Sequence, residues 1–151
     1  MATRSTIAIE LADGTVKQVY CHWDGYLSFN GRLLRDHYSD PTQLRQLIDL
    51  GDISSLAPTI GVQHPFSAAE AGMDLREYDR LYDKMTTFYA RDRGETKCQA
   101  QSYWDFGMYK ISGRSEEFDY ILRNDGVWYY RSYGRDFVEL VPDLQAELVD
   151  N

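Results

Sequence analysis

The chain has 151 residues, 43% of them hydrophobic, which predicts one domain spanning residues 1–151 with a packed core. Its 24 acidic and 16 basic side chains give a net charge of -8, which disfavours direct binding to DNA, RNA or an anionic membrane. The sequence opens without the pattern of a secretion signal, and no apolar run approaches the length of a membrane span. Cys21 and Cys98 form no CxxC pair, so we expect a cytoplasmic protein with reduced thiols.

Two strands are predicted first, over Thr3–Leu11 and Val16–Trp23, joined by a tight turn at Asp13–Gly14. With a two-residue loop, Glu10 lies opposite Lys17 as a favourable cross-strand pair. Apolar side chains then occupy both faces, and we expect a sheet that is covered on both sides near this hairpin. One face carries Ala8, Val19, Cys21 and Trp23, and the other carries Ile7, Ile9, Leu11, Val16 and Tyr20.

Helices are predicted in the middle of the chain. A short one is expected over residues 32–38, and a longer one after Asp40, which can cap it, with Pro41 at its first position and Gly51 at its end. Ser67 has capping-box spacing before a short helical turn. Residues 74–85 carry an apolar stripe at helical spacing, which we interpret as core. Residues 86–90 then read as a strand, followed by a charged loop over residues 91–95.

The last third predicts a second hairpin, with strands over Phe118–Arg123 and Val127–Tyr133 around Asn124–Gly126. A C-terminal helix is expected over Pro142–Val149, with its leucines facing inward, and residues 98–111 are ambiguous. The expected fold is α+β: an antiparallel sheet of two hairpins plus one further strand, packed by two or three helices.

The segment Tyr20–Tyr26 concentrates a thiol, an imidazole, an indole, a carboxylate and two phenols. A cysteine nucleophile needs an imidazole or a helix N-terminus to lower its pKa. Adjacent strand residues point to opposite faces, so Cys21 cannot pair with His22 and would need His37 or His64. Buried cysteine is the commoner case. We expect no catalytic residue, and we also expect no metal or cofactor, because paired metal ligands and phosphate-binding glycine loops are lacking.

Aromatic side chains are the better candidates for function. Trp23, Tyr26 and Phe29 lie in and after a turn, and aromatic residues together with arginine anchor many protein interfaces. The alternative is that these rings plug the end of the core. A motif Tyr-x-Arg-Asp-x-x-Glu begins at Tyr89 and again at Tyr133. It indicates either partner-gripping corners or strand-end turns in which arginine pairs with its neighbouring carboxylate; the arginines concerned are Arg91, Arg93 and Arg135.

Several segments together resemble a family of small bacteriophage, prophage and mobile-element proteins to which no activity is assigned. These segments are Ser5–Ala8, Tyr20–Tyr26, Gly51–Leu56, Tyr89–Glu95, Phe118–Ile121 and Gly126–Tyr129. The resemblance covers most of the chain except Thr59–Thr86, and it implies a phage-type origin and a setting inside a bacterial host.

The leading hypothesis is a non-catalytic protein that binds and modulates a host or antiphage-defence protein. Its predicted partner-binding residues are Trp23, Tyr26, Phe29, Arg91, Arg93, Tyr133 and Arg135. One alternative is an acidic mimic of nucleic acid that blocks a DNA- or RNA-binding host protein, which requires carboxylates gathered on one face. Another is a small enzyme or nucleotide binder centred on Cys21, which requires a cleft joining this thiol to a histidine.

Overall fold

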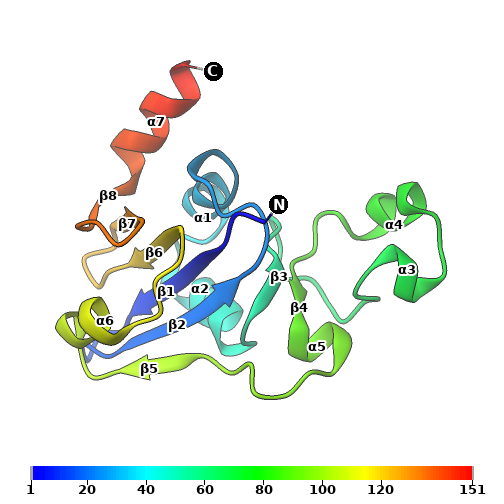
Figure 1. Ribbon diagram of the computed structural model, residues 1–151, viewed down its shortest axis with the longest axis horizontal. Helices are drawn as coiled ribbons and strands as arrows, with labels where there is room; N and C mark the ends of the chain where they lie inside the picture. The colour runs from blue at the N-terminus through cyan, green and yellow to red at the C-terminus, as the bar shows by residue number, and fades with distance from the viewer. Residues whose placement is uncertain (1, 151) are drawn as a thin grey trace.

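The computed structural model describes residues 2–150 and has an α+β fold built on a mixed eight-stranded sheet (Figure 1). The predicted class and both predicted hairpins are confirmed. The sheet, however, is mixed and not antiparallel, and four further strands join the hairpins where one was expected. Seven helices form within residues 2–150, where two or three were predicted. The strands are β1 Ser5–Glu10, β2 Val16–Cys21, β3 Ile53–Ser55, β4 Thr87–Phe88, β5 Gln101–Tyr103, β6 Phe118–Leu122, β7 Trp128–Ser132 and β8 Val138–Glu139. The helices are α1 Arg32–His37, α2 Pro41–Asp49, α3 Ala68–Ala71, α4 Leu75–Tyr82, α5 Tyr89–Arg93, α6 Phe106–Ser112 and α7 Leu140–Asp150, with a π-helical turn η1 over Leu27–Gly31.

The first hairpin forms as predicted, but its register differs by one residue from the expected one. The turn is closed between Leu11 and Thr15, whose N–H and C=O groups join at 2.8 Å, so three residues form the loop. Glu10 therefore lies opposite Val16, and the predicted pairing of Glu10 with Lys17 is wrong. Because side chains alternate along a strand, this slip changes the face on which many of them lie. Ile7, Ile9, Val19 and Cys21 share one face, and Ala8 and Val16 lie on the other.

The order of strands is β4-β3-β2-β1-β6-β7-β8, with β5 also paired to β2. Two of the pairs are parallel: β1 with β6 over Ser5–Ile9, and β2 with β3 at Cys21. The free side of β2 is shared, since β3 pairs with its last residue and β5 with Val16–Gln18. Each parallel pair joins strands that are separated by helices in the sequence, so the local pattern of either strand did not reveal it.

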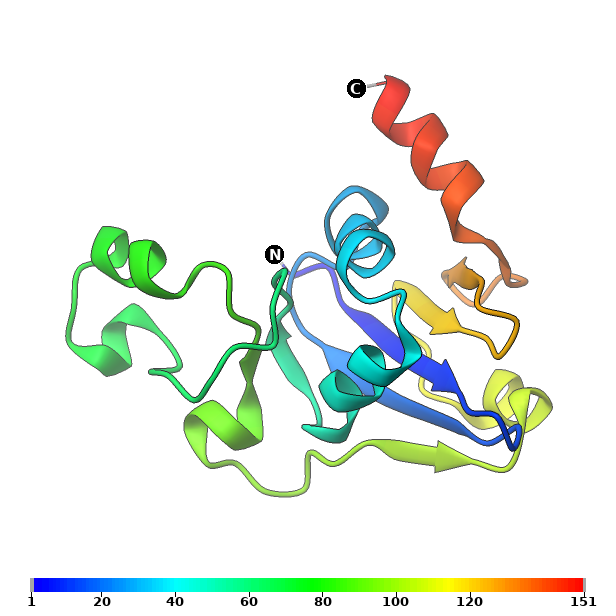
Figure 2. The same cartoon turned by 180° about the vertical axis from the view of Figure 1, so that it is seen from behind.

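Helices cover both faces of the sheet, as the two views from opposite sides show (Figures 1 and 2). On one face, the main core joins α1, α2 and α7 to the sheet through buried Leu34, Leu44 and Leu144. On the other face, α6 places buried Tyr109 against Ala8, Val16 and Ile121 of the strands. The expectation of a sheet covered on both sides near the first hairpin is confirmed.

The helices around the main core were predicted correctly from local sequence patterns. The Asp40 carboxylate accepts a hydrogen bond from the Thr42 N–H at 3.0 Å, and Pro41 is the first residue of α2. Gly51 follows the helix with a φ of +89°, a conformation that favours glycine. In α7, Leu144 is fully buried and Leu148 packs against the same core, as predicted.

The helical stripe over residues 74–85 is present, but its interpretation as core is wrong. Residues 60–84, with α3 and α4, form an arm that extends away from the sheet (Figure 1). No residue of α4 is buried, and the exposed fractions of Leu75 and Leu81 are 64% and 42%. Its tyrosines pack instead within the arm, where Tyr82 stacks on His64 at 5.2 Å and the Tyr78 hydroxyl donates to the Pro65 carbonyl at 2.6 Å.

Three further segments complete the comparison with the predicted elements. The expected strand over residues 86–90 is limited to β4, because the chain turns into α5 at Tyr89. The same helix, Tyr89–Arg93, occupies most of residues 91–95, where a charged loop was predicted. The ambiguous segment contains β5 and α6. The second hairpin is confirmed, with Leu122 opposite Trp128. Within residues 2–150, none of the helices combines the length and the hydropathy needed to cross a bilayer.

Candidate functional site: an aromatic loop at one edge of the sheet

The loop between β2 and α1, residues 22–30, presents three aromatic side chains to solvent. The exposed fractions of Trp23, Tyr26 and Phe29 are 44%, 38% and 39%. The rings of Tyr26 and Phe29 contact each other with centroids 6.1 Å apart. The Trp23 indole packs edge-on against the imidazole of His22 at 4.7 Å, so it is supported from one side and open on the other. These rings therefore do not plug the end of the core; we call this segment the aromatic loop.

Hydrogen bonds from the sheet fix the backbone at the start of the loop. The N–H groups of His22 and Trp23 donate to the carbonyls of Ile53 and Ser54, each at 3.0 Å, which continues the pairing of β2 with β3. The Tyr20 hydroxyl lies 2.7 Å from Nδ1 of His22 and holds the ring that supports Trp23. Trp23 is thus placed by strand geometry.

Buried polar groups fix the middle of the loop from beneath. The Asn30 side chain is fully buried, and its Nδ2 donates to the Trp23 carbonyl at 3.1 Å and approaches Sγ of Cys21 at 3.4 Å. The hydroxyl of buried Tyr120, on β6, donates to the Gly25 carbonyl at 2.6 Å. Because these donors come from different elements, the loop has few ways to move without losing a buried hydrogen bond.

Two backbone positions show that the loop is tightly constrained: Gly25 by its close approach to the sheet, and Asp24 by its backbone conformation. A Cβ atom added at Gly25 would lie 2.7 Å from Cβ of Ser5 and 2.9 Å from the Thr3 carbonyl oxygen, so only glycine fits there. Asp24 adopts a φ of +59°, in the left-handed region that non-glycine residues seldom occupy. Such conformations persist where the surroundings enforce them, and here the neighbouring contacts do so.

Cys21 serves this loop as a structural residue. Its side chain is fully buried, and burial raises the pKa of the thiol to about 12, although the hydrogen bond from Asn30 acts in the opposite direction. The Sγ atom also donates weakly to the Trp23 carbonyl at 3.7 Å. A neutral, buried thiol is a poor nucleophile, so the geometry gives no support to chemistry centred on Cys21.

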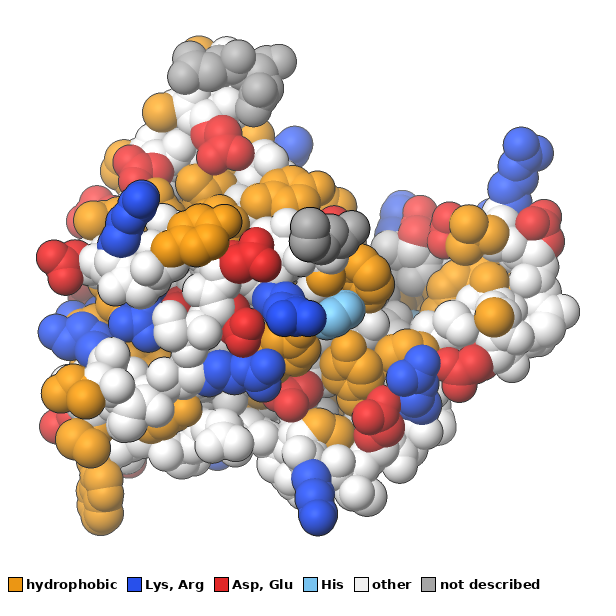
Figure 3. Space-filling model, in the orientation of Figure 1, with side chains coloured by type: hydrophobic (Ala, Val, Ile, Leu, Met, Phe, Trp, Pro, Cys, Tyr) orange, Lys and Arg blue, Asp and Glu red, His pale blue; other side chains and the backbone are white. Residues whose placement is uncertain are grey.

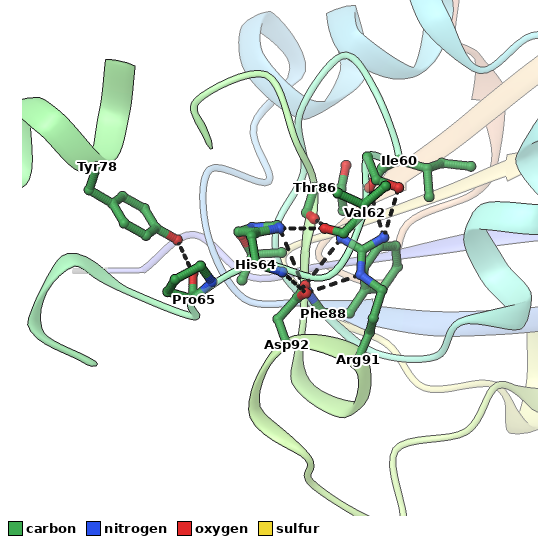
Figure 4. A network of polar contacts seen from close by, with 11 residues as sticks. Ile60, Val62, His64, Pro65, Tyr78, Thr86, Phe88, Arg91 and Asp92 are labelled. Atoms are coloured by element: carbon green, nitrogen blue, oxygen red, sulfur yellow. Dashed lines mark hydrogen bonds and ion pairs between the residues drawn. The ribbon is translucent and has the colours of Figure 1, made fainter. Parts of the chain in front are cut away.

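His37 and His64 do not approach this thiol as a catalytic partner. His37 is exposed at the end of α1, and His64 belongs to a separate network beside β4 (Figure 4). Its Nδ1 lies 2.7 Å from the Val62 carbonyl, its Nε2 lies 3.0 Å from Oγ1 of Thr87, and Asp92 is 3.7 Å away. Although these residue types resemble a hydrolase triad, the histidine and the carboxylate are 1% and 0% exposed, and the short contact of Nδ1 is to a carbonyl. This network joins the arm to β4 and α5.

The guanidinium groups of Arg91 and Arg93 are used within the chain. Arg91 donates to the carbonyls of Ile60 and Thr86 at 3.0 and 2.8 Å, and it forms an ion pair with buried Asp92 (Figure 4). Arg93 binds Glu70 and Glu95 and lies over the Phe66 ring, with its guanidinium carbon 3.7 Å from the centroid. Both hold the arm to α5, and neither lies on the aromatic loop.

Tyr133 and the aromatic loop lie at the same end of the strands, since Tyr133 follows the last residue of β7 and the loop follows the last residue of β2. Tyr133 has 68% of its surface exposed, and its ring contacts Phe118 at 6.2 Å. Cys21, Ser5, Phe118 and Ser132 lie opposite one another across β2, β1, β6 and β7. Neighbouring strands are about 4.8 Å apart, and three such spacings separate β2 from β7, so Tyr133 is roughly 15 Å across the sheet from the start of the aromatic loop. That separation is within reach of a single protein interface.

The repeated Tyr-x-Arg-Asp motif does not form two equivalent corners. Asp92 is buried and accepts hydrogen bonds from the N–H groups of His64 and Phe88, whereas Asp136 is exposed. Arg135 lines a pocket beside α6 and is not grouped with Trp23. The first copy of the motif is therefore a strand-end turn with an arginine–carboxylate pair, as the alternative interpretation proposed.

An exposed apolar surface on α6 was not identified from the sequence. The exposed fractions of Trp104, Met108 and Ile111 are 85%, 45% and 83%. One signal for it was available, because Asp105 caps α6 by accepting the Met108 N–H at 2.8 Å. This cap fixes the start of the helix at Phe106. Met108 and Ile111, three residues apart, then lie on one helix face, away from buried Tyr109.

Charged side chains of both signs are mixed over the face that carries α6 (Figure 3). Many carboxylates are paired: Glu10 with Arg123, Asp119 with Arg131, and Glu116 with Arg114. An imitation of a nucleic-acid backbone needs a continuous row of unpaired negative charge, and the visible face does not present one. Among the side chains that the structure describes, no group of three histidine, cysteine, aspartate or glutamate residues is arranged to hold a metal ion.

Comparisons with protein-family models, with curated proteins and with solved structures found no match.

Proposed function

We propose that this protein is a non-catalytic binding protein that docks on a partner protein through the aromatic loop. The observation that carries the proposal is the pairing of exposed rings with a fixed backbone. Trp23, Tyr26 and Phe29 are each exposed by about two-fifths, while the backbone of the loop is held by buried groups. Aromatic side chains supply most of the binding energy in many interfaces, and tryptophan and tyrosine are the most enriched.

Rigidity strengthens this proposal because association costs conformational entropy. Each flexible side chain that an interface immobilises costs about 0.5–1.5 kcal/mol, and a loop that must become ordered adds to that cost. The aromatic loop is already ordered by Asn30, Tyr120 and the close packing at Gly25. Its rings therefore favour binding with little loss of freedom in the backbone that carries them.

The partner that we propose is a host or antiphage-defence protein in the bacterial cytoplasm. This part of the proposal is supported by the resemblance of the chain to small phage and mobile-element proteins, together with its net charge of -8. Such a charge favours a protein partner over nucleic acid or an anionic membrane. Tyr133, at the same end of the strands, extends the proposed interface beyond the loop.

Affinity capture from a bacterial host lysate tests the proposal. The tagged chain is expected to retain a partner in stoichiometric amount, and the double variant Trp23→Ala, Phe29→Ala is expected to lose it. Leu75→Ala is the matched control, since Leu75 is also an exposed apolar residue but lies on the arm. Recovery of no stoichiometric partner, or equal recovery with the double variant, would contradict the proposal.

A further inference from the structure

On and just before α6, the chain exposes a row of apolar side chains that belong to neither of the two hydrophobic cores. Trp104 precedes the helix, Met108 and Ile111 lie three residues apart on one of its faces, and both Trp104 and Ile111 are more than four-fifths exposed. Single exposed apolar residues are ordinary on protein surfaces, but three within eight positions form a patch. Hydrophobic side chains gather over α6 at the lower left of Figure 3.

A pocket of about 530 Å³ adjoins this row, between α6 and the segment that follows β7. Ile111 belongs to both the row and the pocket. Aromatic rings form part of the lining: Phe106 and Phe137 contact each other at 5.6 Å, and Tyr129 lies beside them. Apolar contact area is therefore continuous from the exposed row into the pocket.

The pocket is cationic although the chain is strongly acidic. Its lining includes Lys110, Arg123, Arg131 and Arg135, with Asp136 as the single acidic residue. Arg123 is paired with Glu10 and Arg131 with Asp119, so these two charges are satisfied within the chain.

The remaining two cations are available to a ligand. The Lys110 ammonium lies over the ring of Phe106, with Nζ 4.9 Å from the centroid, and it forms no ion pair with a described acidic side chain. The Arg135 guanidinium likewise has no hydrogen bond or ion pair to a described residue, and both side chains are exposed. Positive charge at an apolar surface favours a ligand that carries carboxylates or phosphates beside apolar groups.

We infer that Trp104, Met108, Ile111 and the adjoining pocket form a second docking surface, which binds an acidic, amphipathic segment of a partner protein. Such a segment covers the apolar row with its own apolar face and places carboxylates against Lys110 and Arg135. A small anion in the pocket would leave Trp104 in water, and the field of a chain with net charge -8 opposes an extended polyanion. The α6 surface is separate from the aromatic loop and extends the proposed function to a second contact.

Two synthetic peptides of roughly 15 residues test the inference. Both carry leucine and tryptophan at positions i, i+4 and i+7 and uncharged polar residues elsewhere, except at two positions beside the apolar row, where one peptide has glutamate and the other has lysine. Titration calorimetry is expected to show binding of the acidic peptide only. The affinity for the acidic peptide should fall at least about tenfold in the double variant Lys110→Gln, Arg135→Gln, and also in the single variant Ile111→Ser. The affinity for the wild-type chain should decrease as salt is added.

The controls separate this surface from other sources of binding. Arg76→Gln, Lys84→Gln removes the same charge from the arm and should leave binding of the acidic peptide unchanged, as should Trp23→Ala, which disables only the aromatic loop. Equal binding of the two peptides, no binding of either, or insensitivity to the Lys110 and Arg135 changes would overturn the inference. Binding of ATP or inorganic phosphate through the same two cations, without binding of the peptide, would identify a small-anion site and also overturn it.

Discussion

Cys21 shows at the scale of one residue how burial decides chemistry. With its thiol fully buried and its pKa raised to about 12, we expect almost no reaction with a thiol reagent in the folded protein at pH 8. The Cys98→Ser variant isolates the signal, and labelling of Cys21 should become fast only in denaturant. Labelling of the folded variant at the rate of a free cysteine would contradict the structural role assigned to this residue.

Asp52 gives a pH dependence of stability at the same scale. Its carboxylate accepts the Tyr20 N–H at 2.9 Å, but burial raises its pKa. A carboxyl whose pKa is higher in the folded than in the unfolded chain stabilises the fold when the pH is below the pKa of the unfolded chain, near 4. This contribution is lost as the pH rises through the pKa of the folded chain. We therefore expect Asp52→Asn to raise the free energy of unfolding at pH 7, by an amount that shrinks towards pH 3. Urea unfolding at both pH values measures this difference, and a gain that persists at low pH would be inconsistent with it.

At the scale of elements, the aromatic loop depends on β6 through the Tyr120 hydroxyl. In Tyr120→Phe the Gly25 carbonyl loses its buried donor, which should cost about 1–3 kcal/mol in the free energy of unfolding and should increase hydrogen exchange at residues 22–30. Tyr129→Phe is the matched control, because that hydroxyl binds exposed Asp125 and its loss should change stability by less than about 0.5 kcal/mol. Equal effects of the two changes would argue against a loop held from beneath.

The arm gives a second test at this scale. Leu75 and Leu81 face solvent, so Leu75→Ser, Leu81→Ser should change the free energy of unfolding by less than about 1 kcal/mol. Leu44→Ala, in the fully buried stripe of α2, should cost about 2–5 kcal/mol. Denaturant unfolding of both variants measures the contrast. A loss of several kcal/mol from the arm would restore the interpretation of its stripe as core.

Across the whole molecule, the accuracy of prediction from the sequence follows the range of the interactions involved. Asp40 and Gly51 mark the ends of α2 by local hydrogen bonds and backbone geometry, so the sequence was sufficient there. The register of the first hairpin depended on one residue of loop length. The parallel pairing of β1 with β6 joins segments more than a hundred residues apart, and no local pattern encodes it.

The candidate site follows the same rule. The exposure of Trp23, Tyr26 and Phe29 agrees with the expectation that large side chains in a turn are not needed for the sheet. The roles of Arg91 and Arg93 could not be predicted, because their acceptors include the carbonyls of Ile60 and Thr86 and the Glu70 carboxylate, which the fold brings together.

The most direct test of the aromatic loop as a docking site compares binding with stability in one variant. For the partner captured by the wild-type chain, Trp23→Ala should raise the dissociation constant by about thirtyfold or more, which corresponds to about 2 kcal/mol of binding free energy. The free energy of unfolding should change by less than about 1 kcal/mol, because the indole is 44% exposed. An unchanged dissociation constant, or a loss of binding that only accompanies unfolding of the variant, would contradict the proposal.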